Sequence, residues 1–357
     1  MTEHSSRTCY TAALVGTGRI GFSLGFDKKR EQPASHTMAL LANPRVRIVA
    51  GCDTDTERLA SWQRYVSKKQ HTPVATFTDS ADMYAELRRR ENVPDLIVVA
   101  VNEDAHKAET LAAIRAKPRL VILEKPVALN SAEAEEIARA ADECGVPVMV
   151  NHERRFATDY RMAREYMQKI GDIQSIRAEL FSSLRVYSAQ EEKTGSYSLL
   201  HDGTHLVDIV RFLLDDSAEN AQLTNPTLTG VWKDEKGDVR NFSAHYTTSA
   251  CPAVDISMSG RSRFFSFGVD ILGTTGRICI GNGYAKFYQR KESKLYTGFY
   301  SLARDKSVRL PRKTGYFSNM TQNAVDFLDG KTELKSPLAV AMADLAVLEE
   351  IKAELKK

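Results

Sequence analysis

A lysine stands at the end of an apolar run, where its charge could assist a reaction. Lys125 lies in the segment Leu123-Glu124-Lys125-Pro126, directly after the run at residues 120–123. Continuous apolar runs are typical of parallel strands covered on both faces, and ligands bind beyond the carboxyl ends of such strands. Pro126 disfavours a helical conformation at the preceding residue and so keeps Lys125 at the strand end. An ammonium group in that place could stabilise a developing alkoxide.

Two histidines and two aspartates lie close together in the segment 199–208. The spacings i, i+4 and i+3 predict that His201, His205 and Asp208 share one face of a helix. A neutral imidazole on that face could take a proton from a substrate hydroxyl. Asp202 is displaced by one residue, which turns its side chain about 100° away from the face.

A glycine pattern follows the first apolar run of the chain. Gly16-Thr17-Gly18-Arg19-Ile20-Gly21 comes after the strand candidate at residues 12–15 and before a helical pattern. The first glycine of such a pattern allows a tight turn, the second lets the backbone approach a pyrophosphate, and the third lets the helix pack on the strand. The helix N-terminus then offers N–H groups to the phosphates. The pattern therefore predicts a dinucleotide site.

An aspartate after the second strand candidate would meet the adenosine ribose of that dinucleotide. Asp53 follows the candidate at residues 46–51 and lies 32 residues after the last glycine (53 minus 21), where about 20 is usual. We attribute the excess to a polar insertion at residues 26–35, which we expect on the surface. Because Asp53 and Asp55 would repel a 2′-phosphate, the sequence favours NAD over NADP. Arg58 is the nearby residue that argues for NADP.

A parallel sheet would bring these residues together, and the first part of the chain has the pattern of one. Strand candidates lie at residues 12–15, 46–51, 96–101, 120–123 and 146–150. Helical patterns lie between them, and Asn130 and Gly145 are placed to begin and end one of these helices. The alternation indicates a doubly wound α/β domain.

The remainder of the chain has a different rhythm. Helices are expected at about residues 158–170, 199–214, 319–329 and 337–356, and strands at 173–181, 228–233, 239–247, 254–259, 264–272 and 277–280. This pattern indicates an α+β domain with a largely antiparallel sheet, and the basic stretch 304–313 is expected to be a solvated loop. We place the boundary after Pro126, which gives domains of residues 1–126 and 127–357. The C-terminal helices could pack back on the first domain.

Length and composition limit the class of protein. A chain of 357 residues with 43% hydrophobic and 27% charged residues is typical of two globular domains. A net charge of +3 argues against a nucleic acid or an anionic membrane as partner. The apolar stretches are far shorter than the roughly 20 residues of a membrane span, and the amino terminus lacks the apolar core of a secretory signal. We therefore expect a cytoplasmic protein.

Five cysteines without a CxxC pair argue against a disulfide framework or a structural zinc site.

Five motifs, in this order and at these spacings, resemble those of one protein family. They are Gly16-x-Gly18-x-x-Gly21, Asn102-x-x-x-His106, Glu124-Lys125-Pro126, Asn151-His152-x-Arg154-Arg155-Phe156 and Gly203-x-His205-x-x-Asp208. On these motifs the chain resembles the Gfo/Idh/MocA oxidoreductases, the group of glucose–fructose oxidoreductase and inositol dehydrogenase. The resemblance implies an N-terminal Rossmann domain and a C-terminal α/β domain whose open sheet makes the interface of a homodimer or homotetramer.

The resemblance also implies roles for individual residues. It places Lys125 beside the nicotinamide and the reacting carbon, makes His205 the acid/base for the hydroxyl proton, and implies that Asp208 faces the packed interior. An HxxxH helix could hold zinc, but with Asp208 turned inward we expect no metal. His201 stands where the family usually has an aspartate. A second imidazole would keep His205 neutral, and we count His201 as catalytic.

Two further sets complete the expected site. The cofactor-binding residues are Gly16, Thr17, Gly18, Arg19, Ile20, Asp53, Asn102, His106, Glu124 and Lys125. The candidates for substrate contact are Arg155, Asp202, Arg185 and Tyr197.

The function expected from these residues is hydride transfer between NAD and a hydroxyl or ketone of a sugar, cyclitol or related polyol. Two alternatives stay open. The replacement at His201 would suit an NAD-binding sensor or regulatory homologue without turnover. Some members of the family retain NAD and process glycosides through a cycle of oxidation and reduction, which is the second alternative.

Overall fold

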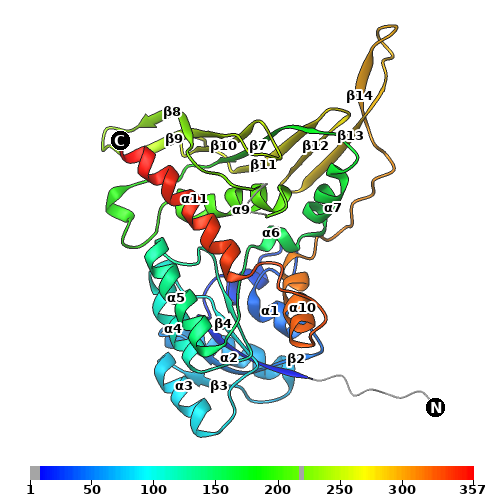
Figure 1. The fold of residues 1–357 in the computed structure, drawn as a ribbon. Helices are drawn as coiled ribbons and strands as arrows, with labels where there is room; N and C mark the ends of the chain where they lie inside the picture. The colour runs from blue at the N-terminus through cyan, green and yellow to red at the C-terminus, as the bar shows by residue number, and fades with distance from the viewer. Residues whose placement is uncertain (1–8, 217–220) are drawn as a thin grey trace, which may run out of the picture. The chain divides into compact units, whose positions relative to one another are not determined.

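The chain folds into two compact units, each built around its own sheet. The computed structural model describes residues 9–216 and 221–357 (Figure 1). The two units comprise the chain up to Phe156 with Gly315–Met342, and Ala157–Thr314 with Ala343–Lys357. The first unit thus continues past the boundary expected after Pro126, because the next helix and strand complete its sheet. The amino terminus in which we expect no secretory signal, residues 1–8, lies outside the described residues.

The first unit holds a six-stranded sheet whose neighbouring strands are all parallel, in the order β3-β2-β1-β4-β5-β6. The strands are β1 Tyr10–Val15, β2 Val46–Cys52, β3 Ala75–Phe77, β4 Leu96–Val99, β5 Leu120–Leu123 and β6 Val148–Val150. This order confirms the doubly wound Rossmann architecture. The apolar pattern does not predict β3, because its three residues are half-buried or exposed.

Helices of the first unit pack in two groups, as the layers of a doubly wound sheet do. One group comprises α1 His36–Ala42, α2 Thr56–Gln70 and α10 Tyr316–Leu328, and the other α3 Ser80–Arg89, α4 His106–Arg115 and α5 Ser131–Cys144. The expected ends of α5 are confirmed: Asn130 Oδ1 accepts from Glu133 N (3.0 Å), and Gly145 has a left-handed φ of 64°.

The helix that follows the glycine pattern is interrupted in the region where the insertion at residues 26–35 is expected. After one turn, in which Phe22 N donates to Gly18 O (2.8 Å), the chain leaves through the short 3₁₀ helix η1 Ser23–Phe26. At the start of α1, His36 N donates to Ile20 O (3.0 Å), and Thr37 N donates to Gly21 O (2.9 Å). An uninterrupted helix makes these bonds over four residues, whereas here they span 16 (36 minus 20).

Twelve residues, 24–35, are therefore an excursion from a helix that resumes in register at His36. Subtracting them from the 32 residues between the last glycine and Asp53 restores the usual spacing of about 20. Residues 28–30 of the excursion are exposed, as expected for an insertion on the surface. Its far end is fixed to α10, because the side-chain Oε1 of Glu31 accepts from Gly315 N (2.6 Å).

The second unit holds an eight-stranded sheet in the order β14-β13-β12-β11-β7-β10-β9-β8. The strands are β7 Ile173–Phe181, β8 Thr227–Lys233, β9 Val239–Tyr246, β10 Val254–Ser259, β11 Ser266–Gly273, β12 Gly276–Gly281, β13 Tyr284–Glu292 and β14 Tyr300–Arg304. Only the β7–β10 pair among them is parallel, which confirms the largely antiparallel sheet. The sequence pattern does not predict β13 and β14, because charged residues follow the alternating start of β13 and almost all of β14 is exposed.

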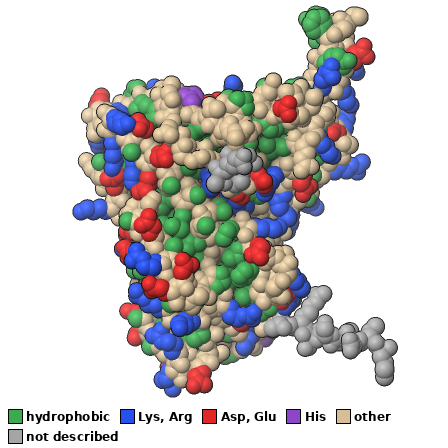
Figure 2. All heavy atoms as spheres, in the orientation of Figure 1, with side chains coloured by type: hydrophobic (Ala, Val, Ile, Leu, Met, Phe, Trp, Pro, Cys, Tyr) green, Lys and Arg blue, Asp and Glu red, His purple; other side chains and the backbone are tan. Residues whose placement is uncertain are grey.

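Helices and a projecting hairpin complete the second unit. The helices are α7 Thr158–Met167, α8 Ser198–His201, α9 Gly203–Leu213 and α11 Leu338–Lys356, the last of which begins in the first unit. Helix α9 packs on β7 and β10. Beyond the sheet, the β13–β14 hairpin exposes Leu295, Tyr296 and Phe299 at its tip, where Figure 2 shows hydrophobic side chains. In the described part of the chain, no helix is long and apolar enough to cross a membrane.

Candidate functional site

Five segments of the first unit meet at the carboxyl edge of the parallel sheet. The strands β1, β2, β4, β5 and β6 are followed by the glycine pattern, Asp53, Asn102, Glu124-Lys125 and Asn151, respectively. Because all these strands run in the same direction, the segments that follow them lie at one edge. The structure therefore brings together the cofactor residues that were expected from separate motifs.

The glycine pattern has the conformation that a dinucleotide loop needs. Gly16 has φ +91°, and a Cβ on it would lie 2.3 Å from the carbonyl oxygen of Ala100. A Cβ on Gly21 would lie 2.1 Å from the carbonyl oxygen of Gly16, so both positions require glycine. A Cβ on Gly18 would meet only the Arg58 guanidinium, 3.5 Å away. This open side of Gly18 is where a pyrophosphate can approach the backbone, and the loop fits a dinucleotide.

Asp53 is tied to the loop beside which it stands. Its Oδ2 accepts from the main-chain N (2.8 Å) and the Oγ1 (2.9 Å) of Thr17, and its Oδ1 accepts from Asp55 N (2.9 Å). The Arg58 guanidinium lies 3.6 Å from Asp53 Oδ2 and 3.2 Å from Asp55 Oδ2. A carboxylate has about four acceptor positions, so Asp53 retains capacity for ribose hydroxyls.

Lys125 follows β5 and is half-buried, and the residue before it is the centre of a buried network. Glu124 Oε1 accepts from His36 Nε2 (2.6 Å) and from Asn151 Nδ2 (2.6 Å), while its Oε2 accepts from Lys125 N (3.3 Å). Burial raises the pKa of Glu124, but the hydrogen bonds from His36 and Asn151 and the charge of Lys125 outweigh burial and hold this pKa below its ordinary value. Glu124 is therefore an ionised, buried carboxylate.

His106 supports the turn that carries Lys125. Its Nδ1 lies 2.6 Å from Pro126 O and its Nε2 3.3 Å from Val101 O, and the side chain is 1% exposed. Burial lowers the pKa of His106, which favours a neutral ring that donates from Nδ1. Asn102, by contrast, is exposed at the end of β4. Of the two residues expected near the nicotinamide, Asn102 is open to a ligand and His106 binds backbone.

The expected shared face of His201, His205 and Asp208 is wrong. Helix α8 ends at His201 and α9 begins at Gly203, so the two histidines lie in different helices. The His201 side chain is 46% exposed, His205 is half-buried and Asp208 is 1% exposed. Asp202 Oδ1 lies 3.9 Å from His201 Nε2.

Close tertiary contacts surround the position at which α9 begins. Gly203 begins α9 where a Cβ would lie 3.2 Å from the sulfur of Met258 and 3.3 Å from Leu348. The side chain of Asp202 accepts from Ser198 Oγ (2.7 Å) and its N–H donates to Ser198 O (2.8 Å), so Asp202 closes the last turn of α8. The packing partners come from β10 and α11, which are remote in sequence, so the periodicity of the segment could not reveal them.

The residues proposed for substrate contact differ in exposure. Arg155 is fully buried and Tyr197 is 2% exposed, with burial raising the pKa of its hydroxyl. Arg185 is 40% exposed and pairs with Glu191 (2.7 Å) and Asp238 (3.4 Å). Arg185 and the half-buried Asp202 can therefore reach a ligand without rearrangement of the core.

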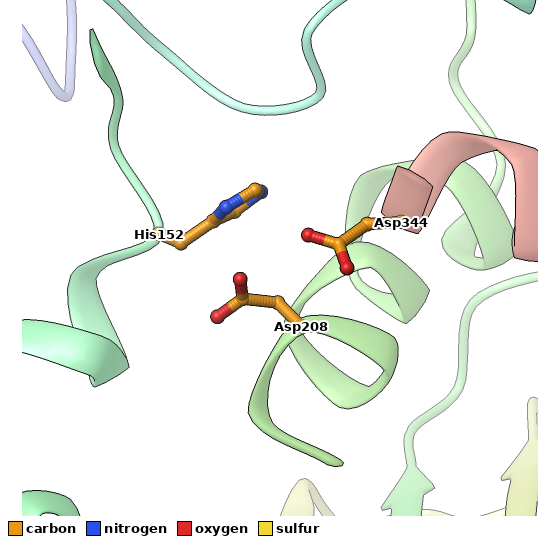
Figure 3. Close-up of side chains that lie close together, drawn as sticks. All are labelled: His152, Asp208 and Asp344. Atoms are coloured by element: carbon orange, nitrogen blue, oxygen red, sulfur yellow. The ribbon is translucent and has the colours of Figure 1, made fainter. Parts of the chain in front are cut away.

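Asp208 belongs to a buried acidic pair that sequence reasoning did not find. Carboxylate oxygens of Asp208, on α9, and Asp344, on α11, lie within 4.8 Å of each other (Figure 3). Arg211 Nη1 lies 2.5 Å from Asp344 Oδ1, which supplies the positive charge that such a pair needs. His152, drawn in the same figure, belongs to the first unit, where its Nδ1 lies 3.2 Å from Ser336 Oγ. Asp344 lies in a helix of ordinary apolar pattern, which gave no signal.

Comparison with known proteins supports the same group of enzymes. Residues 10–152 match the family described as "Oxidoreductase family, NAD-binding Rossmann fold". A D-apiose dehydrogenase of Rhizobium rhizogenes is 27% identical over 250 residues, 66% of this chain and 67% of that protein. A 1,5-anhydro-D-fructose reductase of Ensifer adhaerens is 26% identical over 201 residues, 52% of this chain and 56% of that protein. The chain spans 67% and 56% of the length of these two relatives, and 37% of a scyllo-inositol 2-dehydrogenase of Bacillus subtilis that it also matches.

A solved structure extends the likeness of the fold to the whole chain. The crystal structure of a dehydrogenase from Chromobacterium violaceum has a TM-score of 0.77 and covers 97% of this chain and 95% of that one. At 17% sequence identity, this likeness shows the fold alone.

Proposed function

Because the chain belongs through residues 10–152 to the Gfo/Idh/MocA oxidoreductases, we propose that it is an NAD-dependent oxidoreductase of sugars, cyclitols or related polyols. The reaction is hydride transfer between the nicotinamide and a hydroxyl or ketone carbon. The matched relatives named D-apiose dehydrogenase and 1,5-anhydro-D-fructose reductase support this substrate class.

The observation that carries the proposal is the assembly at the carboxyl edge of the parallel sheet. Gly16, Gly18, Asp53 and Lys125 come from three different strand ends and lie at one edge of one unit. The backbone of the loop would hold the pyrophosphate, and Asp53 would hold the adenosine ribose. The carboxylates of Asp53 and Asp55 favour NAD, and Arg58, which lies between them, offsets part of their charge.

In the proposed reaction, side chains of the protein transfer a proton and stabilise the negative charge of an alkoxide. NAD, when bound, supplies the hydride acceptor. In the direction of oxidation, His205 takes the hydroxyl proton as the C–H bond breaks, and the Lys125 ammonium stabilises the alkoxide that develops. The proposal assigns Lys125 of the first unit and His205 of the second to one substrate, and the motifs that carry both residues support it. His201, with Asp202 3.9 Å away, is assigned a secondary part.

A substrate panel tests the proposal directly. The protein is incubated with NAD and each member of a panel of sugars, cyclitols and polyols. We expect NADH absorbance to rise with at least one of these compounds. His205→Ala should lower kcat by about 10²-fold, whereas the matched change His201→Ala should lower it less than tenfold. An NAD-binding protein that turns over no member of the panel would support the sensor alternative. Tightly retained NAD that is reduced and reoxidised in one cycle would support the glycoside-processing alternative.

We further propose a homodimer or homotetramer built on the sheet of the second unit. The exposed apolar tip of the β13–β14 hairpin, where Leu295 is 81% and Phe299 66% exposed, supports this, because monomers rarely expose such patches. Light scattering on the purified protein measures the mass. A monomer at micromolar concentration would contradict this part of the proposal.

A further inference from the structure

Burying an ionised carboxylate costs free energy unless hydrogen-bond donors replace the lost water. The donors around Glu124 therefore show how its charge is stabilised. Glu124 is 4% exposed and takes one side-chain bond from His36 and one from Asn151, both at 2.6 Å. Its other oxygen faces the main-chain N–H of Lys125 at 3.3 Å. The carboxylate therefore lies between an imidazole, an amide and the backbone of the lysine proposed to be catalytic.

The side chain of His36 has one polar contact among the described residues, and that contact is Glu124. The ring is 1% exposed, its Nε2 faces Glu124 Oε1, and its Nδ1 is buried without a hydrogen-bond partner. Phe317 packs edge-on against it, with ring centroids 5.2 Å apart. A histidine buried in this way gains one hydrogen bond and leaves one nitrogen unsatisfied. A purely structural core position would favour a residue without that cost.

The excursion determines where His36 stands. The main chain of His36 bonds to Ile20 O, which places the ring one helical turn after the glycine pattern, although 15 residues separate the two in sequence (36 minus 21). Ser35 caps the new helix start, because its side chain accepts from Met38 N. The register of the resumed helix thus fixes the distance between the imidazole and the strand end that carries Glu124.

We propose that His36 is a positioning residue for Lys125 and acts through Glu124. His36 Nε2–H holds Oε1, which leaves Oε2 turned to the Lys125 backbone and keeps the carboxylate ionised beside the ammonium. Without this donor the carboxylate can rotate, or it can take up a proton at higher pH. The inference rests on the proposed role of Lys125, and it adds a residue that none of the motifs contained.

Two substitutions with opposite hydrogen-bonding capacity test the proposal. His36→Gln can still donate to Glu124, whereas His36→Leu fills the space without a donor. We expect His36→Leu to lower kcat about tenfold, with the affinity for NAD within about twofold of wild type. We expect the acid limb of its kcat–pH profile to move to higher pH, because the pKa of Glu124 rises. His36→Gln should recover most of the rate and the wild-type profile.

The control is Asp329→Asn, which removes a charged hydrogen-bond acceptor at the opposite edge of the same sheet. It should lower the melting temperature without changing kcat or its pH profile. If His36→Leu keeps wild-type kcat and pH profile, or if His36→Gln is as slow as His36→Leu, the positioning role is wrong.

A second readout works without turnover and so separates this inference from the proposed function. Reductive ¹³C-methylation gives each lysine an NMR signal, and Lys125→Arg identifies that of Lys125. We expect its chemical shift to change in His36→Leu and to return to the wild-type value in His36→Gln. If the wild type is inactive and the Lys125 signal still changes in His36→Leu, the proposed function is overturned and the coupling of His36 to Lys125 is kept. An unchanged signal in His36→Leu would overturn the coupling, whether or not the enzyme is active.

Discussion

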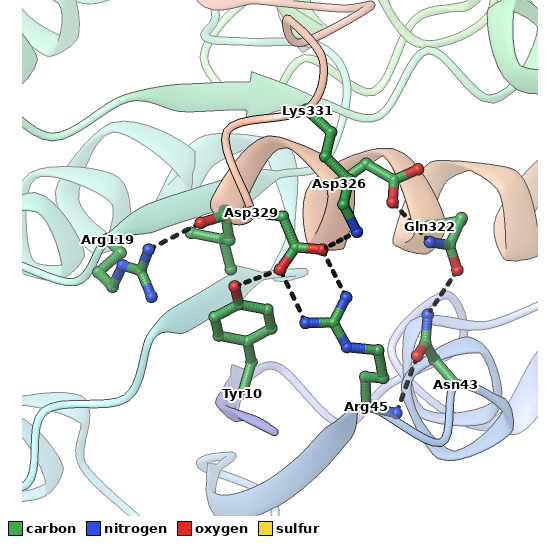
Figure 4. Close-up of polar contacts among 9 residues, drawn as sticks. Tyr10, Asn43, Arg45, Arg119, Gln322, Asp326, Asp329 and Lys331 are labelled. Atoms are coloured by element: carbon green, nitrogen blue, oxygen red, sulfur yellow. Dashed lines mark hydrogen bonds and ion pairs between the residues drawn. The ribbon is translucent and has the colours of Figure 1, made fainter. Parts of the chain in front are cut away.

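The two edges of the parallel sheet each hold a carboxylate that accepts several hydrogen bonds, but from different donors. At the amino edge, Asp329 accepts from Tyr10 Oη (2.6 Å), from Arg45 Nη1 and Nη2 (2.5 and 2.7 Å) and from Lys331 Nζ (2.7 Å), as Figure 4 shows. At the carboxyl edge, Glu124 accepts from an imidazole, an amide and a main-chain N–H.

This difference in donors distinguishes the amino edge, where the cluster stabilises the fold, from the carboxyl edge, where we propose the active site. The bidentate Arg45 and Lys331 neutralise Asp329, and their hydrogen bonds hold the pKa of Asp329 well below its ordinary value. The cluster joins the starts of β1 and β2 to the end of α10. Burial raises the pKa of Glu124, whereas His36, Asn151 and the neighbouring charge of Lys125 lower it. Arginine and lysine hold the carboxylate that ties the fold together at one edge, while an imidazole, an amide and a main-chain N–H hold the carboxylate at the edge where the cofactor residues lie.

Among substitutions at the two edges, we expect the largest effect on activity from Lys125→Met at the carboxyl edge. We expect kcat to fall by about 10²-fold or more, because the change removes the charge that stabilises the alkoxide. Lys107→Met, on the surface of α4, is the matched control and should leave kcat unchanged. The measurement is NADH formation under saturating substrate, with NAD affinity determined by fluorescence. Equal rates for the two variants would remove Lys125 from the mechanism.

The next effect concerns the cofactor at the same edge. Asp53→Asn removes the charge that faces a 2′-phosphate and keeps the oxygen that accepts from Thr17. We expect the preference for NAD over NADP to fall by about tenfold, which corresponds to about 1.4 kcal/mol. Titration of both cofactors against wild type and variant measures the ratio. A wild type that binds NADP more tightly than NAD would show that Arg58 outweighs the two carboxylates.

At the amino edge, Asp329→Asn should affect stability and leave activity within about twofold. Because the pKa of Asp329 is depressed, its contribution to stability is present above the ordinary value of 3.8 and is lost as the pH falls below it. We expect the urea midpoint of wild type to drop toward that of the variant between pH 5 and pH 2. Parallel curves over this range would contradict the role of the Arg45–Asp329 pair.

The smallest effect belongs to His106, which supports the Lys125 turn. Burial lowers its pKa from 6.5, so the unfolded chain binds the proton first, and stability is lost as the pH falls below 6.5. His106→Gln keeps a donor for Pro126 O and does not titrate. The stability of this variant should therefore depend less on pH between 7 and 5.5 than that of wild type. Equal dependence would show that other groups dominate this range.

The sequence predicts features that depend on contacts between residues close together in the chain, and it misses features that depend on distant residues. Residues 96–99 and 120–123 are fully buried strands, and an unbroken apolar run is sufficient to predict them. Gly16 and Lys125 were predictable because a local motif and an adjacent strand define them. The bond of His36 to Glu124 joins residues 88 apart and depends on the register in which the excursion ends, which no periodicity records. The break at Asp202 lies beside close contacts with β10 and α11, which local spacing does not record either.

The excursion from the first helix has a consequence for how this chain could vary. Its two ends meet at adjacent positions of one helix, so its length can change without moving the residues on either side, apart from the contacts that Glu31 and Ser35 make. The entropic cost of closing such a loop grows only as the logarithm of its length, and each doubling adds about 0.6 kcal/mol. Segments of other lengths could therefore replace residues 24–35. The dinucleotide loop on one side and His36 on the other would keep their places.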